Sequence, residues 1–374
     1  MGARKVKKIV LTGGHAATTA LSVIEELVRR SRNEDNLSWD LYWLGTKMAF
    51  EGKKIPTLEF EIFPDRGVTF QHIISGRIQR KFTHWTVPSL LKIPVGFIHA
   101  FLHLVRIRPK VILSFGGFTA FPVVVSAWLL RIPILLHEQT SAVGRANKVS
   151  SIFANKIFIS RKTSKQFLPK RKTVLTGNPI MTQIEEIEPL EGLPKKPIIF
   201  ITGGSRGSEY INNMIFSLLD DLLSKYYVIH QTGYHSHAKA VKVKKGLKKS
   251  FSNNYEIYST IDPMQMDGVY KRASIIIARA GANTVSEIIA IKRPAILIPI
   301  QWAAYNEQFE NAIFASKLGV ARILNQDETT STHLFNEIED IFMHYTKITK
   351  SMSNKKSIDM GASKRVVDEV EKWV

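Results

Sequence analysis

A glycine turn between two apolar runs carries the residues with the clearest capacity for chemistry. Residues 275–278 form an apolar run typical of a buried strand, Gly281 follows, and residues 284–287 (Thr-Val-Ser-Glu) begin a predicted helix. A second apolar run covers residues 295–300. In open α/β sheets ligands bind at such a turn, between a strand's carboxyl end and a helix's amino end. Its backbone N–H groups favour an anion such as a diphosphate.

Glu287 has two interpretations. Thr284 and Glu287 have the spacing of a capping box, in which both side chains serve the start of a helix. The carboxylate is equally able to accept hydrogen bonds from a ribose 2′/3′ diol, as acidic residues do in dinucleotide sites. The spacing leaves both interpretations open.

Composition limits the classes of protein to consider. A chain of 374 residues with 44% apolar residues is long enough for two domains with cores of ordinary size. The absence of cysteine excludes disulfides, thiolate metal sites and cysteine nucleophiles, and fits a reducing cytoplasm. The first apolar run, residues 9–11, is too short for a signal peptide. No Asp-x-Asp motif is present, so we expect no dedicated metal site and no cofactor.

Short strands alternate with helices in both halves of the chain. Predicted strands cover residues 7–12, 41–44, 110–115, 132–136, 197–201, 227–231 and 257–260, and predicted helices cover 16–30, 210–223 and 362–373. This alternation predicts an α/β fold of two doubly wound, Rossmann-like domains facing each other across a cleft.

A polar segment rich in proline divides the two halves. We expect an N-terminal domain over residues 1–184, a linker over 185–196 and a C-terminal domain over 197–350. The remaining residues, 351–374, are expected to pack back across the linker onto the N-terminal domain.

A formal charge of +20 implies an anionic partner. Residues 66–137 contain nine basic residues and no acidic residue, and large apolar side chains such as Phe82 and Trp85 are mixed among them. This mixture favours an anionic membrane surface, although a solvated or nucleic-acid-facing basic surface stays open. Residues 111–130 are apolar enough to suggest a membrane span, but Gly116, Gly117 and Pro122 favour a strand-turn-helix instead.

Several motifs in a fixed order resemble the MurG family, the peptidoglycan N-acetylglucosaminyltransferases of the two-domain GT-B fold. In chain order they are Thr12-Gly13-Gly14-His15, Trp43-Leu44-Gly45-Thr46, Gly116-Gly117-Phe118, His137-Glu138-Gln139 with Asn147, Gly177-Asn178-Pro179, residues 203–207 (Gly-Gly-Ser-Arg-Gly) and residues 274–308. One glycine turn is a weak signal, whereas the ordered set is specific.

The resemblance implies an inverting transfer of N-acetylglucosamine from UDP-N-acetylglucosamine to a polyprenyl-diphosphate-linked N-acetylmuramoyl-pentapeptide, forming the lipid II precursor of the cell wall. It implies a peripheral location at the cytoplasmic face of the membrane, with no nucleic acid as partner. Phe118, Thr140 and Met181 depart from the family pattern, which leaves open a related enzyme with another lipid-linked acceptor. UDP-N-acetylglucosamine 2-epimerase and a basic nucleic-acid- or membrane-binding scaffold are the alternatives.

The resemblance also implies roles for individual residues. His15 is the candidate base, because it follows the first glycine turn and imidazole titrates near neutral pH. Residues expected at the donor are Thr12, Gly14, Ser205, Arg206, Gly207, Ile261, Gly281, Ala282, Asn283, Thr284, Glu287, Glu307 and Gln308. Residues expected at the acceptor or the cleft are Gly13, Gly116, Gly117, Phe118, His137, Glu138 and Thr140. For His137 and Glu138 an ordering role competes with direct function.

Overall fold

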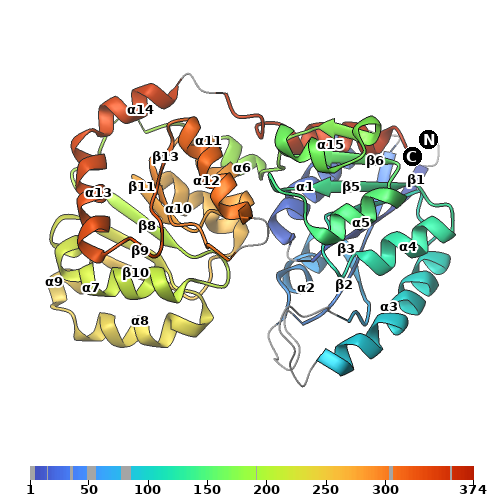
Figure 1. Ribbon diagram of the computed structural model, residues 1–374, viewed down its shortest axis with the longest axis horizontal. Helices are drawn as coiled ribbons and strands as arrows, with labels where there is room; N and C mark the ends of the chain where they lie inside the picture. The colour runs from blue at the N-terminus through green and yellow to red at the C-terminus, as the bar shows by residue number, and fades with distance from the viewer. Residues whose placement is uncertain are drawn as a thin grey trace. The chain divides into compact units, whose positions relative to one another are not determined.

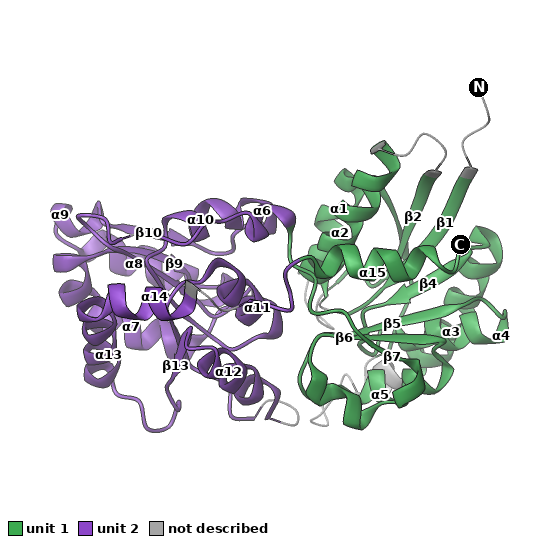
Figure 2. Cartoon of the chain, turned by 90° about the horizontal axis from the view of Figure 1, so that it is seen from above, with its two compact units in different colours: residues 1–181, 361–374 green, residues 182–360 purple. Residues whose placement is uncertain are grey.

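The computed structural model describes residues 5–14, 16–33, 37–48, 56–76, 86–190, 192–302, 306–353 and 356–374. The chain forms two compact units (Figures 1 and 2). Unit 1 consists of Met1–Met181 together with Gly361–Val374, and unit 2 consists of Thr182–Met360. The segment 185–196 therefore belongs to unit 2, where the buried Arg293 side chain donates to Glu188 O at 3.1 Å.

Unit 1 is built on a parallel sheet with the order β3-β2-β1-β4-β5-β6-β7. Its strands are β1 Lys5–Thr12, β2 Leu37–Gly45, β3 Val68–His72, β4 Val111–Ser114, β5 Ile134–Glu138, β6 Lys156–Ile159 and β7 Thr173–Leu175. Its helices are α1 Ala17–Asn33, α2 Leu58–Ile62, α3 Thr86–Ile107, α4 Phe121–Leu129, α5 Arg145–Phe153 and α15 Ala362–Glu371, with short 3-10 turns η1 Pro64–Arg66, η2 Lys162–Phe167 and η3 Lys170–Lys172.

The order of strands in unit 1 reverses between β1 and β4. From β1 the chain moves outward to β2 and β3, and from β4 it moves the other way to β7. Right-handed crossovers then place α1 on one face of the sheet and α4 and α5 on the other. Because helices cover both faces, every residue of β4 and β5 is buried, as parallel strands require.

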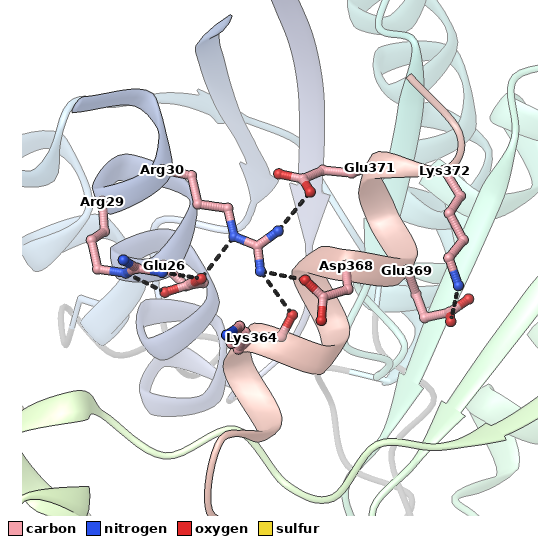
Figure 3. A network of polar contacts seen from close by, with 8 residues as sticks. All are labelled: Glu26, Arg29, Arg30, Lys364, Asp368, Glu369, Glu371 and Lys372. Atoms are coloured by element: carbon pink, nitrogen blue, oxygen red, sulfur yellow. Dashed lines mark hydrogen bonds and ion pairs between the residues drawn. The ribbon is translucent and has the colours of Figure 1, made fainter. Parts of the chain in front are cut away.

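The last helix, α15, belongs to unit 1 and packs against α1 (Figure 3). The buried Arg30 guanidinium donates to Glu26 at 2.7 Å on its own helix, to Asp368 at 2.5 Å and to Glu371 at 2.6 Å. It also reaches Lys364 O at 3.2 Å. One arginine thus ties residues more than 330 positions apart, and these carboxylates raise its pKa.

Unit 2 repeats the plan with the parallel order β10-β9-β8-β11-β12-β13. Its strands are β8 Ile198–Thr202, β9 Tyr227–Gln231, β10 Tyr255–Tyr258, β11 Ile275–Ala278, β12 Ala295–Leu297 and β13 Ala321–Ile323. Its helices are α6 Thr182–Glu185, α7 Glu209–Lys225, α8 Tyr234–Gly246, α9 Lys249–Ser252, α10 Met266–Arg272, α11 Ala282–Ile291, α12 Glu307–Lys317, α13 Ser331–Met343 and α14 Tyr345–Ser353, with the 3-10 turn η4 Pro263–Gln265.

The sequence therefore predicted two doubly wound α/β units correctly. The strand expected at residues 257–260 lies two residues earlier, at Tyr255–Tyr258, because Tyr255 is fully buried against α7 and α8. The apolar residues 111–130 are β4, its glycine turn and α4. Among the described helices, none combines the length and the apolar character that crossing a membrane requires.

Candidate functional site

The carboxyl ends of β8 and β11 lie side by side in unit 2. Thr202 pairs with Ala278 at the end of both strands, and the strand order reverses between them. Two loops therefore start from neighbouring points: residues 203–208 and residues 279–281. This is the topological switch point at which open α/β sheets bind their ligands.

The first loop is a glycine turn that approaches the end of β9. Gly204 and Gly207 have φ of 79° and 73°, a conformation that side chains rarely adopt, and the Gly207 N–H donates to Gly204 O at 2.9 Å. A Cβ on Gly207 would lie 2.1 Å from Thr232 O. Glycine is therefore required there, and the turn leaves Ser205 and Arg206 exposed at its tip.

The second loop leads directly into α11. Gly281 is the N-cap residue and offers no side chain, so the first helical N–H groups, at residues 282–284, have no side-chain cap from it. Thr284 lies inside the helix and not at its N-cap. The capping-box interpretation of Thr284 and Glu287 is therefore wrong, because the helix begins three residues earlier than the motif requires.

Glu287 pairs with a tyrosine from another helix. The Tyr270 hydroxyl of α10 donates to Glu287 Oε2 at 2.7 Å. Burial raises the pKa of the Glu287 carboxyl to about 7, although the Tyr270 hydrogen bond opposes this change. Near neutral pH this carboxyl exchanges its proton, and its charged form is a strong acceptor for hydroxyl donors.

Arg279 is a functional candidate that the sequence patterns missed. Its side chain is 7% exposed, and its Nε donates to Ser208 Oγ at 3.1 Å, just ahead of α7. Its terminal nitrogens donate to Ile298 O at 2.9 Å and to Gln326 Oε1 at 2.7 Å. None of these partners is a carboxylate, so burial lowers the pKa of Arg279 to about 10. The signal in the sequence was a cation placed directly between a buried strand and a glycine turn.

Other expected donor residues lie at the same edge of the sheet. Ile261 lies three residues after β10 and is 9% exposed. Gln308, in the first turn of α12, accepts a hydrogen bond from the Ile300 N–H at 3.1 Å and so holds the loop after β12. Glu307 is the first residue of α12, after Asn306 at φ 57°.

In unit 1 two glycine turns meet at the corresponding switch point. The Gly14 N–H donates to Gly116 O at 2.9 Å, and a Cβ on Gly117 would lie 3.1 Å from Gly14 Cα. Thr12 is fully buried and its hydroxyl donates to the backbone of β2, while a Cβ on Gly13 would lie 3.1 Å from the Trp43 ring. His15, the candidate base, lies outside the described residues.

Glu138 organises the loop after β5. The carboxylate is 3% exposed and accepts hydrogen bonds from the Thr140 N–H at 2.9 Å, the Asn147 amide at 2.8 Å and the Gly144 N–H at 3.3 Å. The Thr140 hydroxyl lies 2.7 Å from the same carboxylate. Burial raises the pKa of Glu138, and these donors oppose the rise.

His137 is fully buried, with Nε2 3.2 Å from Gly177 O, and Phe118 is 44% exposed in the turn after β4. The described residues contain no group of three acidic or histidine side chains that would hold a metal ion.

Comparison with known proteins agrees with this arrangement. Residues 12–159 match the N-terminal domain of glycosyltransferase family 28, and residues 198–367 match its C-terminal domain. The chain is 30% identical to the UDP-N-acetylglucosamine–N-acetylmuramyl-(pentapeptide) pyrophosphoryl-undecaprenol N-acetylglucosamine transferase 2 of Bacillus cereus, over 94% of this chain and 97% of the relative. The chain belongs to the MurG family. The transferase of Clostridium tetani is also 30% identical, over 98% of both chains.

The MurG family assignment confirms the resemblance drawn from the ordered motifs, and it makes the chain a glycosyltransferase of the GT-B type. The crystal structure of MurG from Acinetobacter baumannii has a TM-score of 0.67 at 22% identity, covering 98% of this chain and 99% of that one. A UDP-GlcNAc 2-epimerase from Neisseria meningitidis has the same TM-score at 14% identity, covering 98% and 100%. At these identities the structural likeness concerns the fold alone.

Proposed function

We propose that this MurG-family chain transfers N-acetylglucosamine from UDP-N-acetylglucosamine to undecaprenol-pyrophosphoryl N-acetylmuramyl-pentapeptide. The observation that carries the proposal is the match, over nearly the full length of both chains, to relatives named for that reaction. The product is the lipid II precursor of peptidoglycan.

The donor nucleotide is assigned to the switch point of unit 2. The glycine turn at Ser205 and Arg206, which Gly207 closes, and the start of α11 at residues 282–284 offer backbone N–H groups for the diphosphate. Glu287 accepts hydrogen bonds from the ribose, and the backbone of Ile261 contacts the base. Glu307 and Gln308 lie at the start of α12 for the sugar hydroxyls.

The positive potential for the leaving UDP comes from protein groups at this edge. Arg279 is a buried cation whose hydrogen bonds go to neutral acceptors, so its charge is not cancelled by a carboxylate among those partners. The helix dipoles of α7 and α11 add partial positive charge at their amino ends. Such preorganised groups stabilise the negative charge that develops as the bond from the sugar to the diphosphate breaks.

The acceptor is assigned to unit 1. The turns at Gly13-Gly14 and Gly116-Gly117 bind its diphosphate, and Phe118 and Thr140 flank them. Glu138 and His137 act by ordering this region, since both side chains are buried. His15 takes the proton from the acceptor hydroxyl as its oxygen attacks the anomeric carbon; inversion in one displacement leaves no covalent intermediate on the enzyme.

The charge of the chain supports docking of unit 1 at the cytoplasmic face of an anionic membrane. Unit 1 has 31 basic and 13 acidic residues, a net charge of +18, whereas unit 2 has 21 and 19, a net charge of +2. Between residues 66 and 184 the single acidic residue is the buried Glu138. The stretch of basic residues that begins at residue 66 therefore extends well past residue 137.

Helix α3 supplies an apolar face to this basic unit. From residue 91 onward, the exposed large apolar side chains of this helix are Leu91, Val95, Ile98, Phe101, Leu102 and Val105, and most of them recur at helical spacing. Its exposed cations are Arg106 at its end and Arg108 just beyond it. Apolar side chains flanked by cations are typical of a helix that lies on an anionic lipid surface. The other members of this stretch, Arg77, Arg80, Lys81, Phe82 and Trp85, lie outside the described residues.

The function is tested with purified full-length protein, UDP-N-acetylglucosamine and the polyprenyl-diphosphate-linked acceptor in detergent. We expect UDP release and a lipid product heavier by one N-acetylhexosamine, both dependent on the acceptor and both strongly reduced in His15→Ala. A panel of other UDP-sugars and other lipid-linked acceptors in the same mass-spectrometric assay identifies a different specificity. Conversion of the donor to its 2-epimer without acceptor would instead identify an epimerase.

A further inference from the structure

The Tyr270 side chain connects the core of unit 2 to Glu287. It lies on α10, is 1% exposed, and donates from its hydroxyl to Glu287 Oε2 at 2.7 Å. Its ring meets Phe200 of β8 edge-on, with ring centroids 5.8 Å apart and an interplanar angle of 80°. Because Phe200 is fully buried in the strand that ends at the glycine turn, packing fixes the position of the phenol oxygen.

We propose that Tyr270 is a positioning residue for the donor nucleoside, since its hydroxyl holds Glu287 Oε2 and leaves Oε1 to accept a hydrogen bond from a ribose hydroxyl. The inference rests on the proposed function, because it takes the unit 2 switch point as the nucleoside site. It adds Tyr270 as the residue that orients the Glu287 carboxylate toward the ribose hydroxyls. Tyr270 acts through Glu287 and not by touching the nucleotide.

The hydrogen bond acts on the charge of Glu287 as well as on its orientation. A hydrogen bond donated to a carboxylate favours the charged form, whereas burial favours the protonated form, which has less capacity to accept. Removing the Tyr270 hydroxyl therefore both frees the carboxyl group and makes it neutral at pH 7.

The charged groups around Glu287 do not replace this donor. The cations of α10, Lys271 and Arg272, pair at 2.8 Å with Asp267 and Glu256. The other helices that pack on α11 are α6 and α12, and the charged side chains that they carry are Glu185, Glu307, Glu310 and Lys317. None of them alters the pKa of Glu287, so the Tyr270 hydrogen bond is what opposes the burial that favours the protonated form.

The test compares Tyr270→Phe with Tyr345→Phe in the full-length protein. Tyr345 is the matched control, because it is also buried in unit 2 but its hydroxyl donates to Ser274 O at 3.1 Å. Titration of the Glu287 carboxyl by carbon NMR, without nucleotide, should move upward by roughly 1 to 2 pH units in Y270F. The control should titrate as the wild type does.

Calorimetric binding of UDP at pH 7 and pH 9 gives the functional readout. In Y270F the dissociation constant should rise about tenfold at pH 7 and stay within about threefold of wild type at pH 9, where the carboxyl is again charged. With donor substrate at pH 7, KM should rise in parallel while kcat stays within about twofold. Comparison with Y345F in the same buffers removes the contribution of the phosphate's own titration.

An unchanged Glu287 titration in Y270F would overturn the role of Tyr270. The role would also be overturned by UDP binding that is weakened as much in Y345F as in Y270F, which indicates a general packing defect. A wild-type protein that does not bind UDP at all would reject the nucleoside site itself, and Tyr270's role with it. Binding of UDP by wild type and Y270F with equal affinity would reject only the role of Tyr270.

Discussion

Replacing Glu287 by glutamine separates the charge of this side chain from its shape. The folded carboxyl titrates at about 7, whereas the same group in the unfolded chain titrates near 4.5. Between these values the folded state binds more protons than the unfolded state. The free energy of unfolding of the wild type should therefore fall as pH rises through this window, and level off above it.

The size of the effect follows from the difference between the two pKa values. A difference of about 2.5 pH units corresponds to at most about 3–4 kcal/mol, and the partial exposure of Glu287 to solvent reduces this to about 2 kcal/mol. Glutamine keeps an acceptor for the Tyr270 hydroxyl but does not ionise. Without nucleotide, E287Q should match wild type near pH 4 and be about 2 kcal/mol more stable at pH 8, or roughly 4–8 °C in melting temperature.

UDP should reverse this order at pH 8. A ligand at 100 times its dissociation constant stabilises the folded state by about 2.7 kcal/mol. The wild type gains this stabilisation, and E287Q loses most of it because a neutral amide is a poorer acceptor for a ribose diol. The variant is thus expected to be the more stable protein without UDP and the less stable one with it.

Scanning calorimetry at pH 5, 6, 7 and 8 measures the first effect, and hydrogen exchange of the β11 amides reports unit 2 separately. Glu310→Gln is the matched control, since Glu310 is an exposed carboxylate on the neighbouring α12. A stability difference between E287Q and wild type that stays constant from pH 5 to pH 8 would refute the buried-carboxyl reasoning. Equal stabilisation of both proteins by UDP would refute the ribose contact.

Three further outcomes are expected from other parts of the chain. Gly207→Ala should lower the free energy of unfolding by about 2–4 kcal/mol and abolish UDP binding. Gly204→Ala has a similar φ but no atom within 4 Å of its Cβ position, so it should lower the free energy of unfolding by only about 1 kcal/mol. Chemical denaturation measures the stability of each variant, and calorimetry measures its UDP binding. Arg30→Ala should destabilise unit 1 by about 2–4 kcal/mol and increase hydrogen exchange in α15, while Lys372→Ala, which breaks only an exposed pair, should change stability by less than about 0.5 kcal/mol. Leu102→Glu on the exposed face of α3 should lower binding to anionic vesicles about tenfold in a sedimentation assay without changing UDP affinity; unchanged vesicle binding would exclude α3 from the docking surface.

The sequence alone predicted the local pattern of this protein. Apolar runs such as residues 275–278 and the glycine turns that follow them determine strands and their ends, because a parallel strand covered by helices must be apolar along its length. Alternation of such runs with helices was sufficient for two doubly wound units. The motifs and their order were sufficient for the family. Strands, turns and individual motifs can all be predicted from sequence because each depends on residues that are near neighbours along the chain.

Only the tertiary structure determined which side chains meet at the candidate site. Tyr270 of α10 reaches Glu287 of α11 across 17 positions, and Arg279 reaches Gln326 across 47. The strand order places β8 beside β11, and the chain after β13 returns to this edge, where Gln326 accepts from Arg279 and from Tyr210. The capping-box spacing at Thr284 gave a wrong interpretation because the helix starts at Ala282, ahead of the motif, and its Glu287 bonds to Tyr270 instead. A short motif shows which residues are able to bond to each other, but the packing of helices on the sheet determines which of those bonds form.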